Sequence, residues 1–100
     1  MYIAMNRFRI APGREKDFIA VWQNRDSHLE RVPGFIEFHL LQGETDSVGT
    51  LFASHSIWQS AEAFGNWTRS DAFRQAHARA GDTRGIYLES PQFEGFNVVL

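Results

Sequence analysis

The sequence contains no cysteine. Disulfide bonds, zinc–thiolate sites, iron–sulfur clusters and thiol nucleophiles are therefore excluded. Lysine is nearly absent, because Lys16 is the only lysine among the ten cationic residues. There is no basic block and no basic amphipathic helix, and the formal charge is −2, so we expect no nucleic-acid partner and no membrane partner.

Targeting segments and common catalytic motifs are also missing. No apolar run approaches the roughly 20 residues of a membrane span. The first ten residues, MYIAMNRFRI, alternate in polarity and lack the charged-then-apolar order of a signal peptide, so we expect a cytoplasmic protein. Neither a Gly-rich phosphate loop, nor GxGxxG, nor a Ser-His-Asp arrangement occurs, which leaves kinase, nicotinamide and acyl-hydrolase chemistry unsupported.

Aromatic side chains, in contrast, are abundant. The chain of 100 residues is 14% aromatic and carries nine Phe. This content indicates either an aromatic-rich core or a ligand pocket lined by rings. The length suits one domain, and we expect residues 1–100 to form it.

The hydrophobic pattern predicts a β-α-β-β-α-β order. The expected elements are a strand at 2–10, a helix at about 14–31, strands at 35–42 and 50–58 around a polar loop, short helices at 61–67 and 71–80, and an extended segment at 86–100 that Pro91 interrupts. Ser60 and Ser70 can cap the two short helices. This order is that of the α+β ferredoxin-like sandwich, with the helices on one face of a four-stranded antiparallel sheet.

The strand at 35–42 is apolar on both sides. Strict alternation would place Phe35 and Leu41 on one side and Ile36, Phe38 and Leu40 on the other. A sheet with one solvated face alternates more cleanly than this. We therefore predict that a partner's sheet covers the second face and that the protein is a homodimer.

Asn6 is the first candidate for chemistry. It shares one side of the first strand with the apolar residues Tyr2, Ala4, Phe8 and Ile10. A carboxamide there costs about 1–3 kcal/mol if its hydrogen bonds are not made, so it requires a partner. From this position alone, a core Asn bonded to nearby backbone is favoured over a functional residue.

His77 is the second candidate, because it follows Phe73 by four residues and so lies on or beside the buried side of its helix. A neutral imidazole there could bind a metal, act as a base or bond to backbone. No second His or carboxylate stands three or four residues away, so a local multi-ligand zinc or iron site does not assemble. A lone histidine does suit heme, which needs only an axial imidazole from the protein.

Further residues surround these two candidates in the expected fold. Trp67 ends one short helix just before the next begins, so its indole can enter the cavity that His77 faces. Phe64 and Phe73 would supply apolar walls, and Arg25 could meet a carboxylate at the mouth. Core packing for Trp67, and solvent or an acid partner for Arg25, remain alternatives. Elsewhere, His39 and His55 lie on adjacent predicted strands, and His28 is expected on the polar side of its helix.

Asn6 on the first strand, Trp67 before the last helix and His77 within it together resemble the Isd-type heme-degrading monooxygenases. These proteins belong to the antibiotic biosynthesis monooxygenase (ABM) superfamily of dimeric ferredoxin-like proteins, also described as dimeric α/β-barrels. The segments AMNRFRIAPGRE, RVPGF, SIWQSAEAFGNWTRSDAFRQAHA and FEGFNVV extend the resemblance over essentially the whole chain. The Asn/Trp/His set is its specific part, since other ABM members share the scaffold without it.

The resemblance implies a role for each candidate. His77 would be the proximal ligand of heme iron, Asn6 would hydrogen-bond the oxygen species on the distal side, and Trp67 would press on the porphyrin and ruffle it. Heme would be both cofactor and substrate, opened by O2 and electrons from an unidentified external donor to a linear tetrapyrrole with release of iron. Arg25 would contact a propionate, while Phe64 and Phe73 would line the pocket.

Three other functions fit parts of the pattern. A cofactor-free ABM monooxygenase would oxidise an aromatic polyketide or quinol in the same cavity without an axial histidine. A heme carrier would hold heme without degrading it. A structural or regulatory dimer would leave Asn6 and His77 unexplained.

Overall fold

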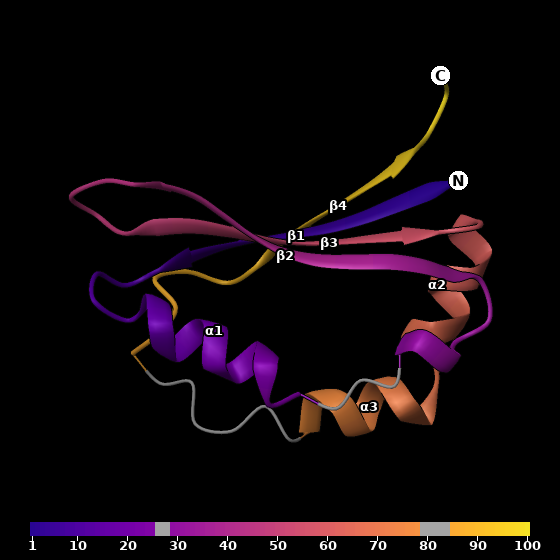
Figure 1. Ribbon diagram of the computed structural model, residues 1–100, viewed down its shortest axis with the longest axis horizontal. Coiled ribbons are helices and arrows are strands. Elements are labelled where there is room, and N and C mark those ends of the chain that lie inside the picture. The colour runs from indigo at the N-terminus through magenta and orange to yellow at the C-terminus, as the bar shows by residue number, and fades with distance from the viewer. Residues whose placement is uncertain (26–28, 79–84) are drawn as a thin grey trace.

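The computed structural model describes residues 1–25, 29–78 and 85–100, and for residues 75–78 it describes the backbone alone. Four antiparallel strands form one sheet in the order β2-β3-β1-β4. They are β1 (Tyr2–Ile10), β2 (Phe35–Thr45), β3 (Thr50–Trp58) and β4 (Gln92–Asn97). The helices α1 (Glu15–Gln23), α2 (Ala61–Thr68) and α3 (Asp71–Ala78) all lie on one face of the sheet (Figure 1). The predicted ferredoxin-like α+β order is confirmed.

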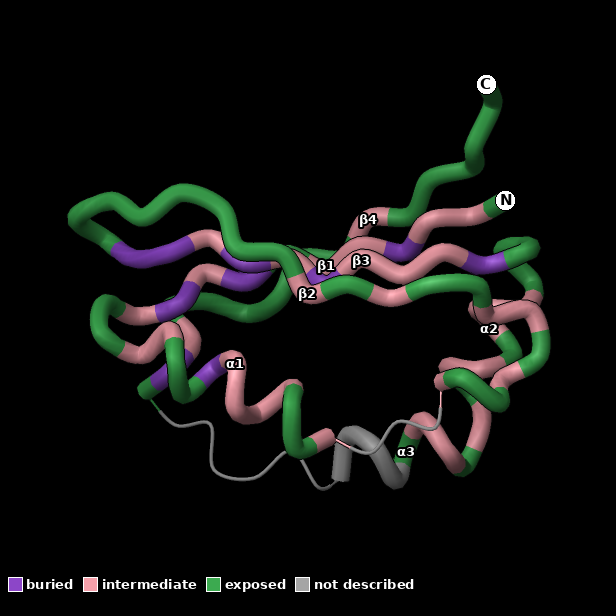
Figure 2. The backbone as a smooth tube through the Cα atoms, in the orientation of Figure 1, coloured by how far each residue is buried: buried purple, intermediate pink, exposed green. Residues whose placement is uncertain are grey.

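The alternation of β1 separates the two faces of the sheet. Ala4, Phe8 and Ile10 are buried, and Phe8 and Ile10 cluster with Phe18 of α1, whereas Arg7 is exposed. Figure 2 shows the buried stretches of the strands by colour. Within the described part of the chain, no helix is both long enough and apolar enough to cross a membrane.

The main core lies where α1 packs on the sheet. The Phe18 ring of α1 has its centroid 5.1 Å from that of Phe8 and 4.9 Å from that of Phe52. Ile10 and Ile86 complete this buried cluster. A second aromatic group forms at the other end of the sheet, where the buried Trp58 contacts Phe35, Phe64 and Trp67. The space between the two groups becomes the cavity described below.

Both predicted serine caps of the short helices are present. The Ser60 hydroxyl accepts the backbone N–H of Ala63 at 3.1 Å, and the Ser70 hydroxyl accepts that of Phe73 at 3.2 Å. Ser70 also donates its hydroxyl to the Trp67 carbonyl at 2.6 Å, which ties the end of α2 to the start of α3. These bonds satisfy backbone groups that a helix end leaves unpaired.

The predicted helix at 14–31 is too long. The α-helix ends at Gln23, and a separate 3-10 helix covers Leu29–Arg31, with residues 26–28 and therefore His28 outside the described residues. Asn24 follows the helix, and Asn, Asp and Ser side chains compete with the backbone for its hydrogen bonds. The sequence NRDS at 24–27 thus weakens a helix that the apolar spacing alone would continue.

The predicted sides of the strand at 35–42 are wrong at its start. A β-bulge between Phe35 and Glu37 lets Phe35 pair with Trp58 and pack edge-on against its ring at 5.5 Å, on the side that Phe38 also faces. Ile36 is left 47% exposed. A bulge adds one residue to a strand and so breaks the two-residue period on which the prediction rested.

The chain after Gly85 forms less strand than predicted. Tyr87 makes one isolated bridge to Ile10, and the ladder of β4 begins only at Gln92, after Pro91. The polar loop of the hairpin is also shorter than expected, because β2 continues to Thr45. Proline cannot donate to a ladder, which explains the gap before β4.

Asp46 closes the β2–β3 hairpin, and its replacement gives a prediction. Its Oδ1 accepts the backbone N–H groups of Gly49 at 2.9 Å and Val48 at 2.8 Å, and these bonds lower the pKa of Asp46. A lowered pKa stabilises the fold above the ordinary carboxyl pKa, and the contribution is lost as pH falls through the folded value. Asp46→Ala should lower the urea midpoint at neutral pH, with the difference from wild type shrinking in acid. Glu44→Ala, an exposed change in the same hairpin, is the control.

Candidate ligand cavity

A cavity of about 470 Å³ lies between the sheet and the helices. Its volume falls within the range typical of small-molecule and cofactor sites. The described residues that line it are Ala4, Asn6, Trp22, Arg25, Leu29, Phe38, Ser54, Ser56, Trp58, Phe64, Trp67, Thr68, Phe73 and Phe93. Aromatic rings dominate the list, and Arg25 is the one charged group among the described lining residues.

The α2–α3 junction builds the aromatic wall. Trp67 meets Phe73 edge-to-face with centroids 4.8 Å apart, and Phe64 lies 6.2 Å from Trp67. The Ser70 cap sets this geometry, because it ends α2 directly after Trp67 and starts α3 two residues before Phe73. The cavity thus receives the three aromatic residues that the sequence pattern placed there.

Asn6 brings a carboxamide to the floor of the cavity. It pairs with Ser54 of β3 on one side and with Phe93 of β4 on the other, on the central strand of the sheet. Among the described residues, none hydrogen-bonds its side chain, so the expected bond to nearby backbone is not made. The amide and carbonyl of Asn6 therefore remain available to a molecule in the cavity.

Arg25 stands at the other end of the cavity, two residues beyond α1. Its guanidinium carbon lies 4.2 Å from the centroid of the Trp22 ring, a cation–π contact, and Trp22 in turn stacks on Phe38 at 5.5 Å. No carboxylate in the described part of the chain pairs with Arg25, and its buried Nε has no hydrogen-bond partner there. The buried Nε1 of Trp22 likewise has no hydrogen-bond partner among the described residues.

Burial shifts the pKa values of two groups at the Arg25 end of the cavity. It lowers the pKa of Arg25 and raises that of Tyr87, while the charge of Arg25 acts in the opposite direction on Tyr87. A partly desolvated cation that has no carboxylate partner among the described residues favours binding of an anion. The cavity therefore suits a largely apolar ligand that carries a carboxylate or a similar group.

His77 belongs to α3 by its backbone, but its side chain lies outside the described residues. Its placement in the cavity thus stays a prediction. In the described parts of the chain, no group of three or more His, Asp or Glu residues could hold a metal ion. Asn6, Trp67, Phe64, Phe73 and Arg25 do meet at one cavity.

Several lining residues were not singled out from the sequence. Ser54 and Ser56 are polar residues on the inward side of β3, between the buried Phe52 and Trp58. Their alternation with these aromatics is a signal that could have been used. Trp22 and Phe93 had no such local signal, because their places depend on where α1 ends and on the pairing of β4 with β1.

Comparison with known proteins identifies the family of this scaffold. The family model described as antibiotic biosynthesis monooxygenase matches residues 1–79. The chain belongs to the antibiotic biosynthesis monooxygenase family. A relative from Listeria welshimeri, named heme-degrading monooxygenase, is 33% identical over 91 residues, covering 84% of this chain and 75% of the relative.

Solved structures of ABM-family fold show two different chemistries. MhuD from Mycobacterium tuberculosis, described as a heme-degrader with two hemes in its active site, superimposes with a TM-score of 0.76 at 25% identity, covering all of this chain and 97% of MhuD. SnoaB from Streptomyces nogalater, a cofactor-independent oxygenase, gives 0.70 at 24% identity, covering 99% and 93%. The second likeness shows the fold alone.

Proposed function

We propose that this ABM protein is a heme-degrading monooxygenase, which opens the porphyrin with O2 and external electrons to a linear tetrapyrrole and releases iron. One observation carries the proposal: among the described residues, the ring-lined cavity holds at one end an Arg25 that no carboxylate pairs, and on its floor an Asn6 side chain without a hydrogen-bond partner. The name of the Listeria relative and the hemes of MhuD support it.

The described residues fit heme. A porphyrin is a broad apolar ring, which matches the aromatic walls of Trp67, Phe64 and Phe73, and its carboxylates need a donor such as Arg25. When bound, heme would supply the iron that activates O2 and the ring that is oxidised. We assign the axial imidazole to His77, as the sequence resemblance implies.

The remaining residues would position the bound ligand and polarise its reacting groups. Asn6 can donate a hydrogen bond from its carboxamide into the cavity. The Trp67 indole, held against Trp58 at 5.6 Å and against Phe73, is rigid enough to distort a flat ligand that presses on it. The apolar walls would keep bulk water from the reacting centre.

We further propose a single-domain homodimer that acts in the cytoplasm. On the sheet face away from the helices, Leu41 and Phe96 are 43% and 45% exposed. Apolar side chains exposed on one face of a sheet favour coverage by another protein surface. A second copy of the chain would cover them, and sedimentation at micromolar concentration should then give twice the monomer mass. A monomer would contradict this part.

Turnover tests the proposed function. The hemin-loaded protein, supplied with ascorbate under air, should lose its Soret band and yield a linear tetrapyrrole with free iron. A heme carrier would keep the band unchanged under the same conditions. A protein that takes up no hemin but oxidises an aromatic quinol would be a cofactor-free ABM monooxygenase, and either result would overturn the proposal.

Arg25→Ala should weaken hemin binding about ten-fold, as expected for the loss of a charge-assisted hydrogen bond. The position of the Soret band should not change, because Arg25 is assigned to a carboxylate and not to the iron. The matched control is Arg69→Ala, an exposed arginine that bonds Asn66 outside the cavity. If Arg25→Ala instead removed the axial-ligand spectrum, the assigned orientation in the cavity would be wrong.

A further inference from the structure

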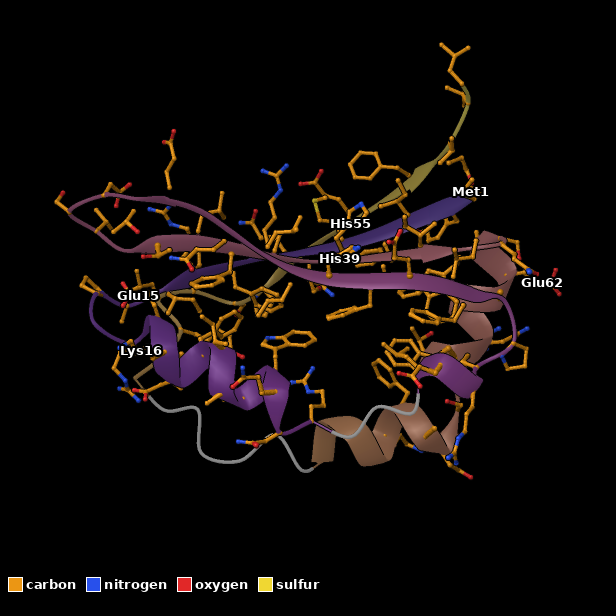
Figure 3. The ribbon with its side chains drawn as sticks, in the orientation of Figure 1. Met1, Glu15, Lys16, His39, His55 and Glu62 are labelled. Atoms are coloured by element: carbon orange, nitrogen blue, oxygen red, sulfur yellow. The ribbon has the colours of Figure 1, made fainter. Side chains whose placement is uncertain are left out.

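Two residues at the α1 end of the cavity contact each other twice. The helix α1 begins at Glu15, labelled in Figure 3, and it carries Trp22 in its last turn, while Arg25 follows two residues after the helix ends. The backbone N–H of Arg25 donates to the Trp22 carbonyl at 3.2 Å, and the guanidinium carbon lies 4.2 Å from the centroid of the Trp22 ring. Trp22 thus contacts both the backbone and the side chain of Arg25.

The Trp22 ring is itself fixed by the core. It stacks on Phe38 of β2 with centroids 5.5 Å apart and 25° between the ring planes. The rings of Phe8 and Phe18 contact it edge-on, with centroids at 5.9 Å and 6.3 Å. Stacked and edge-to-face pairs at these separations attract each other. An arginine that rests on this ring is therefore held at a fixed place relative to the sheet.

The contact leaves the hydrogen-bond donors of Arg25 for a ligand. A guanidinium that lies over an aromatic ring uses none of its N–H groups there, and these groups form a planar fork that matches a carboxylate. The described residues offer no carboxylate to this fork, and its buried Nε has no hydrogen-bond partner among them. Tyr87 is the described titratable group whose charge acts on Arg25, but burial raises the pKa of Tyr87, so its phenol is neutral near pH 7 and supplies no counter-ion.

An arginine held in this way binds an anion better than a mobile one. An Arg side chain has many rotamers, and immobilising such a side chain on ligand binding costs affinity. The Trp22 ring restricts these rotamers before a ligand arrives, because the cation–π contact is favourable, especially at a partly desolvated site. The ring therefore places a positive charge at one end of the cavity in advance.

We propose that Trp22 is a positioning residue for carboxylate recognition: its ring, fixed against Phe38, holds Arg25 where it selects ligands with a free carboxylate over uncharged ligands of the same shape. This inference rests on the proposed function and specifies the class of ligand as a flat, largely apolar acid. Trp22 acts through Arg25 and takes no part in the reaction itself.

The test compares hemin with hemin dimethyl ester, in which both carboxylates are methylated and the flat ring is unchanged. The wild type should bind hemin about ten-fold more tightly than the ester, as expected for one charge-assisted hydrogen bond. Trp22→Leu should reduce this preference to about two-fold or less, whereas Trp22→Phe should keep most of it, because a phenyl ring still offers its face to the cation. Visible absorption gives both affinities, and the position of the Soret band should not change.

The ester is an internal control for the shape of the cavity. Trp22 and Phe38 also line a separate groove of about 320 Å³ between α1 and β2, so removal of the Trp22 ring opens a wall of the cavity. An open wall would weaken hemin and the ester alike and leave their ratio unchanged. The matched control is Phe73→Leu, which removes a lining ring from the α2–α3 wall and should likewise keep the ratio.

The double variant Trp22→Leu/Arg25→Ala shows whether Trp22 acts through Arg25. Arg25→Ala alone should remove the preference, and the double variant should show the same ratio, because both changes act on one interaction. Equal wild-type affinity for the two ligands, a preference retained in Trp22→Leu, or one lost as fully in Trp22→Phe would overturn the role of the ring. If the wild type bound neither ligand, the proposed function would fail and this inference with it, so the two failures are distinguishable.

Discussion

Asn6→Ala should bind hemin with nearly wild-type affinity and open the ring about 100-fold more slowly, the usual cost of losing one well-placed hydrogen-bond donor. The reason is the position of the Asn6 carboxamide, which lines the cavity and bonds to no described residue. Its contribution should therefore appear during the reaction and not in ligand binding. Single-turnover decay of the Soret band with ascorbate and O2 measures the rate.

Ser54→Ala is the matched control for this change. Ser54 pairs directly with Asn6 across the sheet and lines the same cavity, so this change removes a neighbouring polar group from the same floor of the cavity. Its rate should stay within a few-fold of the wild type. If Asn6→Ala and Ser54→Ala slowed the reaction equally, the cavity would need polarity in general and Asn6 would have no special role.

Phe18→Ala should lower the free energy of unfolding by about 3–5 kcal/mol, the usual cost of a large-to-small change at a fully buried aromatic. Phe18 is completely buried and is the one residue of α1 that packs against Phe8, Phe52 and Tyr87 together. Urea unfolding followed by tryptophan fluorescence measures the change.

Lys16→Ala on the exposed side of the same helix is the control, and it should change stability by no more than about 0.5 kcal/mol. A small effect of Phe18→Ala, similar to that of the control, would mean that the core between α1 and the sheet is not packed as the structure has it. An intermediate loss would indicate that neighbouring rings collapse into the space left behind.

Local patterns were sufficient to predict most of the fold. The two-residue period of β1 assigned Ala4, Phe8 and Ile10 to the inner face, where they are buried. Ser60 and Ser70 marked the helix starts because a hydroxyl before a helix satisfies backbone N–H groups that nothing else reaches. These features depend on neighbours in sequence, which a sequence displays directly.

The errors had two causes: in the first helix one local signal opposed another, and in β2 long-range pairing overrode the local pattern. The apolar spacing of residues 14–31 extended the first helix past Gln23, although the sequence NRDS following it is unfavourable to helix. The bulge at Phe35 could not be read from alternation, because pairing with Trp58 decides the side on which Phe35 lies. Pairing partners far apart in the chain are not visible in a local pattern.

The candidate site was likewise predictable in part from local pattern, while another part depended on long-range packing. Asn6, Trp67, Phe64, Phe73 and Arg25 were expected near one another, and the structure places all five around one cavity. The Trp22 Nε1, which has no hydrogen-bond partner among the described residues, was not expected, since the place of Trp22 depends on its contacts with Arg25 and Phe38. The functional roles of these residues remain predictions.

The central claim is that His77 binds heme iron in this cavity. The most direct test is a hemin titration of the wild type followed by visible absorption, beside His77→Ala and the control His39→Ala, whose residue lies on the sheet face away from the cavity. The account predicts saturable binding with a sharp Soret band in the wild type and in His39→Ala, and a displaced or lost band in His77→Ala. A featureless titration, identical for all three proteins, would contradict it and would favour a cofactor-free ABM monooxygenase.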